Sequence, residues 1–509
     1  MAEDGVLPPS GSEGPARINI DPSRPLGRLD RNVFGGFVEH LGRCINGGLY
    51  EAGSPLSDQR GFRTDVLQLL KPLKLSVLRW PGGNFASNYH WKDGVGAKSS
   101  RPARAELAWG GVEPNQFGTD EFLAYCAELG VAPYICLNMG TGNLSEALDW
   151  VEYCNSATKS YWAGQRRANG HEEPYGVTYW GLGNEMYGEW QVGQLSAAEY
   201  SALAVRWARA IRRAVPDVKL VSCGLNGWSD WDREVIESLV SLVDLHSVHI
   251  YTGSTDYWTN VLSPHQTERA IVTTSALISQ AAYNQGVKVP PRIAYDEWNV
   301  WYRTDDGALE EHYDFDDALA VATYLNIFTR HCGWVKMANL AQMVNAIAPI
   351  ITSTEGAGTQ PIYYPFLLSS QAALDEAVDV STKAPVVPAP SPVASDRWRH
   401  RLSDLGPFST LDVSATCDAS RGRACVTIVN RGLADLASTE LVLRDASFSG
   451  QARVRVLTDR AGALSGPPVA GLAQASSDES WHEAKGERLV LDLPARSFSV
   501  VEAAMEMGN

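Results

Sequence analysis

The sequence predicts an α/β protein made of a (β/α)8 barrel followed by an antiparallel β-sandwich of the jelly-roll kind. Two observations carry this prediction. Short apolar or β-branched runs alternate with segments of helical spacing up to about residue 378, and after that point short alternating stretches are bounded by turn residues. An open doubly wound sheet is the competing α/β fold. No GxGxxG sequence follows the first run to support its nucleotide site.

Eight apolar runs predict the barrel strands, and four intervening segments show the clearest helical spacing. The predicted strands are 33–40, 76–83, 132–140, 177–185, 219–226, 245–251, 292–300 and 337–345. The predicted helices are 64–73, 119–130, 196–214 and 316–331. Several of these helices begin with Ser, Thr or Asp, the residues preferred at a helix N-terminus. Eight β-then-α units are the number that a closed barrel requires.

The composition changes at residues 380–395, where four prolines exclude a helix and indicate a connector. Alternating stretches at 424–432, 438–445, 452–459 and 488–503 then predict the sandwich. The early stretch 16–23 alternates in the same way and can add a strand to it. We therefore predict an N-terminal segment joining the sandwich (1–27), a catalytic barrel (28–378) and the sandwich domain (379–509).

Composition and charge restrict the class of partner. A net charge of −16 disfavours nucleic acid and anionic membranes, because polyanions are repelled, and a neutral substrate fits better. No stretch has the length of a membrane span, and no signal-type apolar run lies near the start, so a cytoplasmic location is expected. The eight cysteines lack metal-ligand spacing and are expected to be reduced thiols. We expect neither a cofactor nor a metal.

Two glutamates lie where the chemistry of a barrel is expected. Glu185 ends the fourth predicted strand and Glu297 lies near the end of the seventh. Active sites of barrels lie at the carboxyl ends of the strands. Two carboxyls facing each other there can cleave a glycosidic bond, one protonating the leaving oxygen and the other acting on the sugar carbon. The alternative for Glu185 is a carboxylate at a helix N-terminus, and the sequence leaves open whether configuration is retained or inverted.

The sequences around these two glutamates resemble those of a known enzyme family. The sequences YWGLGNEMYGEW (179–190) and AYDEWNVWY (294–302) resemble the acid/base and nucleophile motifs of glycoside hydrolase family 51, the α-L-arabinofuranosidases. Further stretches resemble the family in order along the chain, at 34–51, 79–85, 108–118, 247–251 and 358–366. The resemblance implies an exo-acting, retaining enzyme. It would remove terminal α-L-arabinofuranosyl residues from arabino-oligosaccharides, arabinan or arabinoxylan fragments.

The resemblance also implies roles for three residues of the two motifs. Glu185 would be the general acid/base and Glu297 the nucleophile. Glu185 is expected to hold a proton, its pKa raised by an apolar setting and by the neighbouring anionic Glu297. Asn184 would hold the sugar 2-hydroxyl, with an Asx turn after the strand as the structural alternative.

Seven more residues resemble the substrate contacts of the family: Glu39 and Asn84 for the furanose hydroxyls, His249 and Tyr251, Gln360 to complete the sugar pocket, and Trp109 and Trp301 beside the leaving group. His249 and Tyr251 are two apart on one strand and so share a face. Tyr251 is expected to hydrogen-bond Glu297. For Glu39 an ion pair with Arg43 or Arg79 is the alternative, and for Tyr251 and the tryptophans ordinary core packing.

Several alternatives stay open. Another activity on the same pair of glutamates, as an endoglucanase, β-xylosidase or galactofuranosidase, is possible, as is a non-catalytic carbohydrate-binding protein. The loop 251–264 would decide which leaving group fits. The acidic stretch 303–317 is a lid, a subunit contact or a solvated loop. The resemblance raises the possibility of a homohexamer, which no pattern in the sequence tests.

Overall fold

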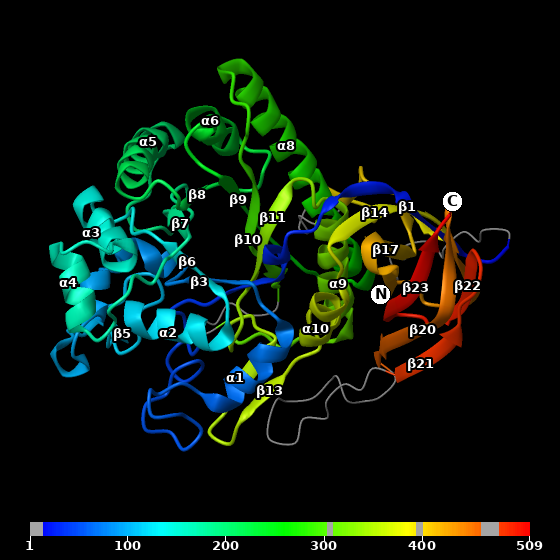
Figure 1. The fold of residues 1–509 in the computed structure, drawn as a ribbon, viewed down its shortest axis with the longest axis horizontal. Helices are drawn as coiled ribbons and strands as arrows, with labels where there is room; N and C mark the ends of the chain where they lie inside the picture. Colours follow the sequence, from blue (N-terminus) through cyan, green and yellow to red (C-terminus); the bar gives the residue numbers. More distant parts are fainter. Residues whose placement is uncertain (1–13, 303–308, 393–400, 460–477, 509) are drawn as a thin grey trace.

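The computed structural model describes residues 14–302, 309–392, 401–459 and 478–508, and it confirms the predicted fold class (Figure 1). Eight parallel strands form a closed barrel in the order β10-β11-β2-β3-β6-β7-β8-β9. These strands are β2 (Gly35–Phe37), β3 (Val77–Trp80), β6 (Ala132–Cys136), β7 (Tyr179–Leu182), β8 (Lys219–Ser222), β9 (Leu245–Thr252), β10 (Arg292–Val300) and β11 (Val335–Ala341). Each lies within or overlaps one of the eight predicted runs. Most end before the run does, because the residues at the carboxyl end turn outward into the loops of the site.

Helices surround the barrel. They are α1 (Thr64–Leu70), α2 (Thr119–Leu129), α3 (Leu144–Asn155), α4 (Tyr161–Ala168), α5 (Ala197–Ala214), α6 (Asp230–Leu239), α7 (Tyr257–Leu262), α8 (His265–Gln285), α9 (Phe315–Arg330) and α10 (Tyr363–Ala372). Helix α5 shows why they form where predicted. Ser196 and Glu199 make a capping box at its start, and one face buries Tyr200, Trp207 and Ile211 against the core.

Helix α9 joins the two parts of the molecule. Nearly all of its residues are buried, as is expected of a helix that is covered on every side. It contacts β10 of the barrel and β17 (Leu411–Asp418) of the second domain, and Figure 1 shows it between the two. Asn326 of α9 donates a hydrogen bond to Asp412 of β17. The barrel and the second domain are therefore packed against each other through a shared buried helix.

The second domain is a mostly antiparallel, nine-stranded sheet in the order β21-β20-β23-β18-β17-β14-β1-β19-β22. Besides β17, its strands are β1 (Arg17–Arg28), β14 (Glu376–Lys383), β18 (Arg423–Asn430), β19 (Leu436–Leu443), β20 (Ala446–Thr458), β21 (Asp478–Glu483), β22 (Arg488–Leu493) and β23 (Ser497–Met507). Contacts between β20 and β22 bring distant strands of the sheet together around a second hydrophobic core. Strand β1 pairs with β14 and β19. The predicted domain boundary between residues 378 and 379 falls inside β14.

Three short two-stranded sheets complete the fold: β4 (Arg104–Ala105) with β5 (Val112–Glu113), β12 (Ile350–Thr352) with β13 (Ala357–Thr359), and β15 (Val386–Val387) with β16 (Phe408–Ser409). The β4–β5 hairpin lies beside the mouth of the barrel. It carries Trp109 between its strands, which places this side chain over the site described below.

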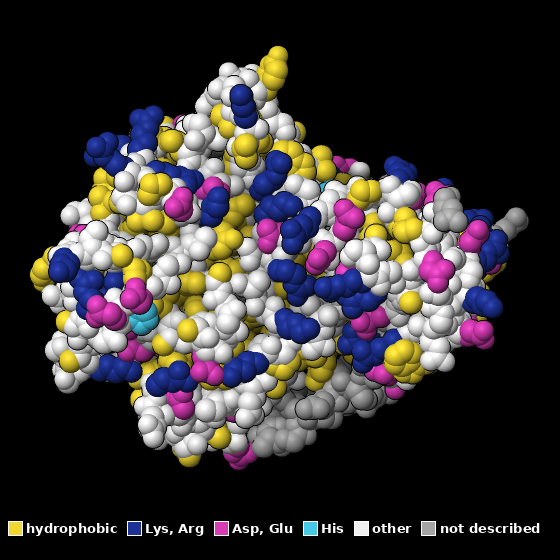
Figure 2. Space-filling model, viewed as in Figure 1, with side chains coloured by type: hydrophobic (Ala, Val, Ile, Leu, Met, Phe, Trp, Pro, Cys, Tyr) yellow, Lys and Arg dark blue, Asp and Glu magenta, His cyan; other side chains and the backbone are white. Residues whose placement is uncertain are grey.

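The surface of the protein carries side chains of both charges. Figure 2 shows Lys and Arg side chains gathered along the middle of one face, although the chain as a whole is acidic. All eight cysteines are buried and free of disulfides. Among the helices in the described ranges, none combines the length and the apolar character needed to cross a membrane.

Candidate active site

A pocket of about 1070 Å³ opens at the carboxyl ends of the barrel strands. Eight of the ten predicted site residues line it, namely Glu39, Asn84, Trp109, Glu185, His249, Tyr251, Glu297 and Trp301. Asn184 lies directly behind the lining, and Gln360 lies elsewhere. The register of the strands thus brings together side chains that are up to 262 residues apart in the sequence, from Glu39 to Trp301.

Glu185 reaches this pocket through a strained turn after β7. Strand β7 ends at Leu182, and Gly183 then adopts a φ of +78°. Glu185 itself has a φ of +42°, a left-handed conformation that costs a residue with a side chain about 1–3 kcal/mol. Such strain is retained where the surrounding structure requires the side chain in one place. Here it directs the carboxylate back over the barrel mouth.

Both carboxylate oxygens of Glu185 accept hydrogen bonds. His249 Nδ1 lies 2.9 Å from Oε1, and Trp190 Nε1 donates to Oε2 at 3.0 Å. His249 is buried on β9, whereas Trp190 is 60% exposed and stands at the pocket rim. Oε1 is therefore held by the barrel interior, and Oε2 faces the side by which a substrate would enter.

Glu297 is held by side chains from two other strands of the barrel, β3 and β9. Arg79 Nη1 of β3 donates to Oε1 at 2.7 Å, and Tyr251 O–H of β9 donates to Oε2 at 2.9 Å, as the sequence predicted for Tyr251. Arg79 is buried and its guanidinium lies over the ring of Phe37, with 4.6 Å to the ring centroid. Because Arg79 also donates to Asn184 Oδ1 at 2.6 Å, one cation holds both the strand-seven acid and the residue beside Glu185.

The two glutamates are close to each other. Glu185, His249 and Glu297 each offer one atom, and these three atoms lie within 4.8 Å of one another. Such a set has the spacing of a cation site. However, the neighbouring carboxylates raise the pKa of His249 to about 10, against the effect of burial, and an imidazolium has no lone pair for a metal. A cation at this place would therefore have to displace the proton of His249 before the imidazole could bind it.

The protonation of the pair differs from the expectation that Glu185 carries the raised pKa. Burial favours protonation of Glu185, but hydrogen bonds from His249, Trp190 and Tyr187 lower its pKa below the ordinary value. Burial also favours protonation of Glu297, and the negative charges of Glu185 and Asp296 add to it, so that its pKa is raised despite His249 and Arg79. In the free protein the pKa of Glu185 is therefore shifted down and that of Glu297 up. The sequence could not show how many donors converge on Glu185.

Glu39 is not paired with an arginine, which removes the structural alternative for it. Its Oε1 accepts hydrogen bonds from Phe85 N and Trp109 Nε1, and its Oε2 accepts one from Gln342 Nε2 at 3.0 Å. Burial raises the pKa of Glu39 to about 8. The two arginines are used elsewhere: Arg79 contacts Glu297, and Arg43 pairs with Glu310.

The loop after β3 leaves room for Glu39 only because it contains glycine. A Cβ on Gly83 would lie 2.5 Å from Glu39 Oε2, closer than two atoms can approach. The next residue, Asn84, lines the pocket, and its Oδ1 lies 3.4 Å from Asn184 Nδ2. Asn184 is only 2% exposed and is oriented by Arg79 and Asn84 rather than by an Asx turn of its own. The sequence RWPGGN therefore places a neutral, polar edge along one side of the pocket.

Two tryptophans form opposite parts of the rim. Trp109 is half-buried and donates a hydrogen bond to Glu39. Trp301 is 36% exposed, and its ring meets that of Tyr251 edge-on, with 5.6 Å between the ring centroids. Neither is an ordinary core residue. Each presents part of an indole to the pocket, a surface suited to the apolar face of a sugar.

The prediction for Gln360 is not supported by the structure. Its side-chain amide forms hydrogen bonds with backbone groups. Nε2 donates to Glu311 O and Ala348 O, and Oε1 accepts from Tyr313 N. It therefore ties two loops together behind the pocket wall. Gln342, at the end of β11, lies in the pocket instead and also accepts a hydrogen bond from Glu39 N. The acidic stretch 303–317 lies partly outside the described residues, and of its described part Leu309 lines the pocket.

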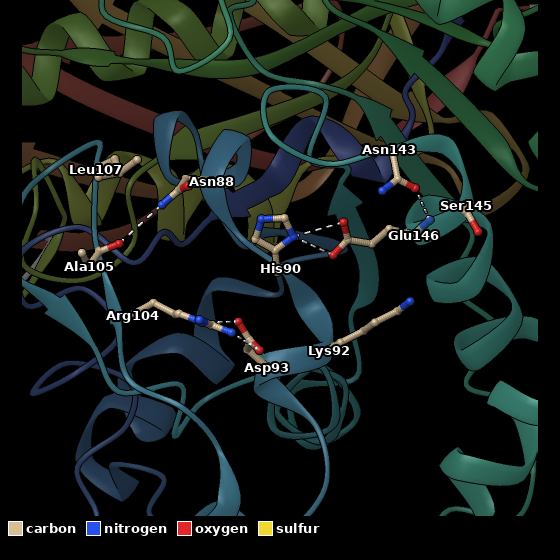
Figure 3. Close-up of a pocket in the computed structure, with 10 residues that line it drawn as sticks. All are labelled: Asn88, His90, Lys92, Asp93, Arg104, Ala105, Leu107, Asn143, Ser145 and Glu146. Carbon is tan, nitrogen blue, oxygen red and sulfur yellow. Dashed lines mark hydrogen bonds and ion pairs between the residues drawn. The ribbon is translucent and has the colours of Figure 1, made fainter.

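A second hollow, of about 820 Å³, lies beside the loops that follow β3 and β6 (Figure 3). Its charged side chains face one another, since Arg104 forms an ion pair with Asp93 at 2.7 Å and His90 with Glu146 at 2.9 Å. Among the described residues that line it, each acid contacts a basic side chain, Asp93 contacting Arg104 and Glu146 contacting His90. It therefore lacks the pair of opposed carboxyls that glycoside cleavage requires.

Four residues of the site had not been predicted to act there: Arg79, Trp190, Asp296 and Gln342. Arg79 did leave a signal, because a charged residue stands inside an otherwise buried strand, VLRW. Asp296 left a similar one, as a second acid inside the strand YDEW. Gln342 and Trp190 lie in loops and left none.

Comparisons with known proteins agree with this geometry. Residues 69–269 match the family described as "Alpha-L-arabinofuranosidase 1 domain", and residues 296–497 match "Alpha-L-arabinofuranosidase C-terminal domain". A protein of Aspergillus fumigatus, "Probable alpha-L-arabinofuranosidase C", is 44% identical over 431 residues, covering 81% of this chain and 84% of its own length. The Bacillus subtilis protein "Intracellular exo-alpha-(1->5)-L-arabinofuranosidase 1" is 36% identical over 453 residues, covering 84% and 87%.

A solved structure is similar over almost the whole chain. The crystal structure of an α-L-arabinofuranosidase from Thermotoga maritima in complex with arabinose has a TM-score of 0.84 and 37% sequence identity. The similarity covers 96% of this chain and 100% of that one. It includes both the barrel and the second domain.

Proposed function

Because the chain belongs to glycoside hydrolase family 51 and is an α-L-arabinofuranosidase, we propose that it removes terminal α-L-arabinofuranosyl groups with Glu297 as nucleophile and Glu185 as general acid/base. One observation supports the double displacement above all. Glu185 and Glu297 have carboxylate oxygens within 4.8 Å of each other. Retaining enzymes place their carboxyls about 5–5.5 Å apart, whereas inverting enzymes need about 6.5–9.5 Å to admit a water.

In the first step, Glu297 attacks the anomeric carbon and the glycosidic bond breaks. Arg79 and Tyr251 hold the attacking carboxylate in line, and Glu185 gives its proton to the leaving oxygen. The leaving sugar takes the place of the Trp190 N–H at Glu185 Oε2, which removes one of the donors that lower the pKa of Glu185. The positive charge that develops on the sugar carbon meanwhile favours ionised Glu297. Both effects favour a protonated Glu185 and an ionised Glu297 when the substrate is bound.

In the second step, Glu185 acts as a base. It takes a proton from water, which attacks the anomeric carbon and releases Glu297. Glu185 is then protonated again and Glu297 is ionised, as both were when the substrate was bound. The same carboxyl thus serves first as acid and then as base, and the configuration of the sugar is retained.

The inner end of the pocket suits a terminal sugar. Glu39 and Gln342 close it with a hydrogen bond to each other, and Trp109 donates to Glu39 from the rim. A buried Glu39 that stays protonated near neutrality has one O–H donor and remaining acceptor capacity for sugar hydroxyls. A closed inner end and an open rim favour an exo mode of cleavage. The name of the Bacillus subtilis relative, an exo-α-(1->5)-L-arabinofuranosidase, points in the same direction.

Turnover of 4-nitrophenyl α-L-arabinofuranoside tests the activity, and azide tests the two roles. E297A should lose several orders of magnitude of kcat/KM and give the β-azide when azide replaces the nucleophile. E185A should give the α-azide, because azide then attacks the glycosyl-enzyme. D120N is a matched control, since Asp120 is bonded to Tyr153 on the outside of the barrel. Wild-type protein that turns over a pyranoside or a glucan but not this substrate would contradict the proposal.

The location and the assembly are proposed on less direct support. We infer that the enzyme acts inside the cell on short arabino-oligosaccharides, since eight buried cysteines are all free of disulfides and the Bacillus subtilis relative is named intracellular. Cell fractionation tests this, and activity found in the medium of intact cells would refute it. The hexamer remains a proposal by family resemblance, which light scattering at micromolar concentration tests.

A further inference from the structure

An irregularity in β10 turns two consecutive acids toward the barrel interior. The pairing of β10 with β9 shifts between Ala294 and Glu297, and its pairing with β11 shifts between Tyr295 and Trp298. Tyr295 and Trp298 both pack outward against Phe328 of α9. Neighbouring residues of a regular strand face opposite sides, so a bulge is required for Asp296 and Glu297 to face the same way.

Asp296 is 1% exposed and does not line the pocket, yet its carboxylate is surrounded by donors. Tyr134 O–H donates to Oδ2 at 2.8 Å, and Ser247 O–H donates to Oδ1. Arg79 Nε lies 3.8 Å from Oδ2. Arg79, His249 and Ser247 lower the pKa of Asp296 and keep it ionised in spite of its burial. The bulge thus places a permanent negative charge directly behind the catalytic cluster.

His249 connects this charge to the two glutamates. Its Nε2 lies 3.3 Å from Asp296 Oδ1, an ion-pair distance without the angle of a hydrogen bond. Its Nδ1 lies 2.9 Å from Glu185 Oε1 and 3.5 Å from Glu297 Oε2. The imidazole is therefore held between three carboxylates. A neutral ring would have one nitrogen without a proton facing an anion, whereas a charged ring presents N–H groups to both sides.

Other titratable groups surround the same cluster: Glu39 after β2, Arg79 on β3, Tyr134 and Cys136 on β6, Tyr187 after β7, Cys223 after β8 and Tyr251 on β9. The tyrosines and the cysteines have a raised pKa and stay neutral, Glu39 has a pKa raised to about 8, and Arg79 stays charged. Of the groups facing His249, the three carboxylates are therefore the ones that set its charge.

We propose that Asp296 is a positioning residue that holds His249 as a cation with Nδ1 facing Glu185, and thereby sets the pH range over which the glutamate pair keeps its working proton. The proposal rests on the proposed function of that pair. Asp296 touches neither the sugar nor the reacting atoms. Its effect reaches the reaction through the charge and the orientation of one histidine.

The test is the pH dependence of kcat/KM in D296N. Removing a negative charge disfavours every protonated form nearby, so the pKa values of His249 and of the glutamate pair should all fall. The acid limb and the alkaline limb of the pH profile of kcat/KM should then both move to lower pH, by about 1–3 units for a charge at this distance. KM for 4-nitrophenyl α-L-arabinofuranoside should stay within about twofold, because Asp296 does not line the sugar pocket.

D232N is the matched control. Asp232 is also buried, and its Oδ1 lies 3.1 Å from Nε2 of His246, a histidine on the same strand as His249. This pair lies outside the catalytic cluster. Whatever D232N does to thermal stability and to the size of the rate, the two limbs should keep their positions. Equal shifts in D232N and D296N would show that breaking any buried Asp–His pair moves the profile, and the proposal would fail.

A measurement on the wild type makes the test independent of the folding of D296N. In protein with ¹⁵N-labelled histidine, the signal that is lost in H249Q should be that of an imidazolium and should persist above pH 8. A neutral His249 at pH 7 would overturn the proposal. Wild-type protein without arabinofuranosidase activity would instead overturn the proposed function. Active wild type with unshifted limbs in D296N would refute this inference alone.

Discussion

Arg79→Met removes the cation that holds both halves of the site. Arg79 Nη1 lies 2.7 Å from Glu297 Oε1, and Nη2 lies 2.6 Å from Asn184 Oδ1. Met preserves much of the stacking on Phe37, so the change is mainly one of charge and hydrogen bonding. Glu297 would lose its nearest positive charge and Asn184 its orienting donor, while Tyr251 would continue to donate to Glu297.

The magnitude follows from the distance. A cation within about 4–6 Å lowers a carboxyl pKa by about 1–3 units, and each unit corresponds to about 1.4 kcal/mol. Burial and neighbouring acids already raise the pKa of Glu297, so losing Arg79 raises it further. Below that pKa, each unit lowers the ionised fraction of the nucleophile tenfold. We expect kcat/KM to fall about 10- to 1000-fold on the acid side of the pH profile, with a smaller loss at higher pH.

The assay is kcat/KM for 4-nitrophenyl α-L-arabinofuranoside from pH 4 to pH 9, with R79K as the companion variant. Lysine keeps the charge but not the two-pronged donation, so R79K should keep its acid limb while losing rate. Unfolding of R79M should require about 3–5 kcal/mol less, because two buried acids lose their partner. An acid limb in the same position in R79M and wild type would refute the assigned role of Arg79.

Three further predictions concern other parts of the site. Burial raises the pKa of Glu39 to about 8, so the folded state binds a proton that the unfolded state releases above about 4.5. Stability should therefore fall as the pH rises from about 4.5 to about 8, and E39Q should abolish that slope in urea unfolding; an unchanged slope would contradict the raised pKa. Q360A should lower the free energy of unfolding by about 1–3 kcal/mol, through the three backbone hydrogen bonds it makes, and leave the KM of the sugar nearly unchanged. A tenfold rise in KM without loss of stability would show instead that Gln360 contacts the sugar. Dialysis against EDTA should not change kcat/KM, and a loss reversed by added metal would show that the cluster of Glu185, His249 and Glu297 holds a cation.

The barrel could be predicted because its strands are buried on both faces. Such strands appear in the sequence as short continuous apolar runs, and eight of these alternate with amphipathic segments. The polar residues that end the runs then mark the open face of the barrel. Glu185 and Glu297 could be placed at this face from the strand pattern alone.

The electrostatics of the site could not be predicted in the same way. The donors that lower the pKa of Glu185 come from β9 and from the loop after β7, and their convergence depends on loop conformation. The bulge at Asp296 breaks the two-residue period on which a prediction of strand faces depends. Gln360 was misplaced for a related reason, since a loop residue has no periodicity to fix its direction.

Trapping a covalent bond between Glu297 and the sugar is the decisive test of the double displacement. A 2-deoxy-2-fluoro α-L-arabinofuranoside with a good leaving group should add one fluorosugar to the protein by mass, and peptide mapping should place it on Glu297. Release of the label should return activity. Full turnover without any labelled protein, or a label on another carboxyl, would contradict the proposed role of Glu297.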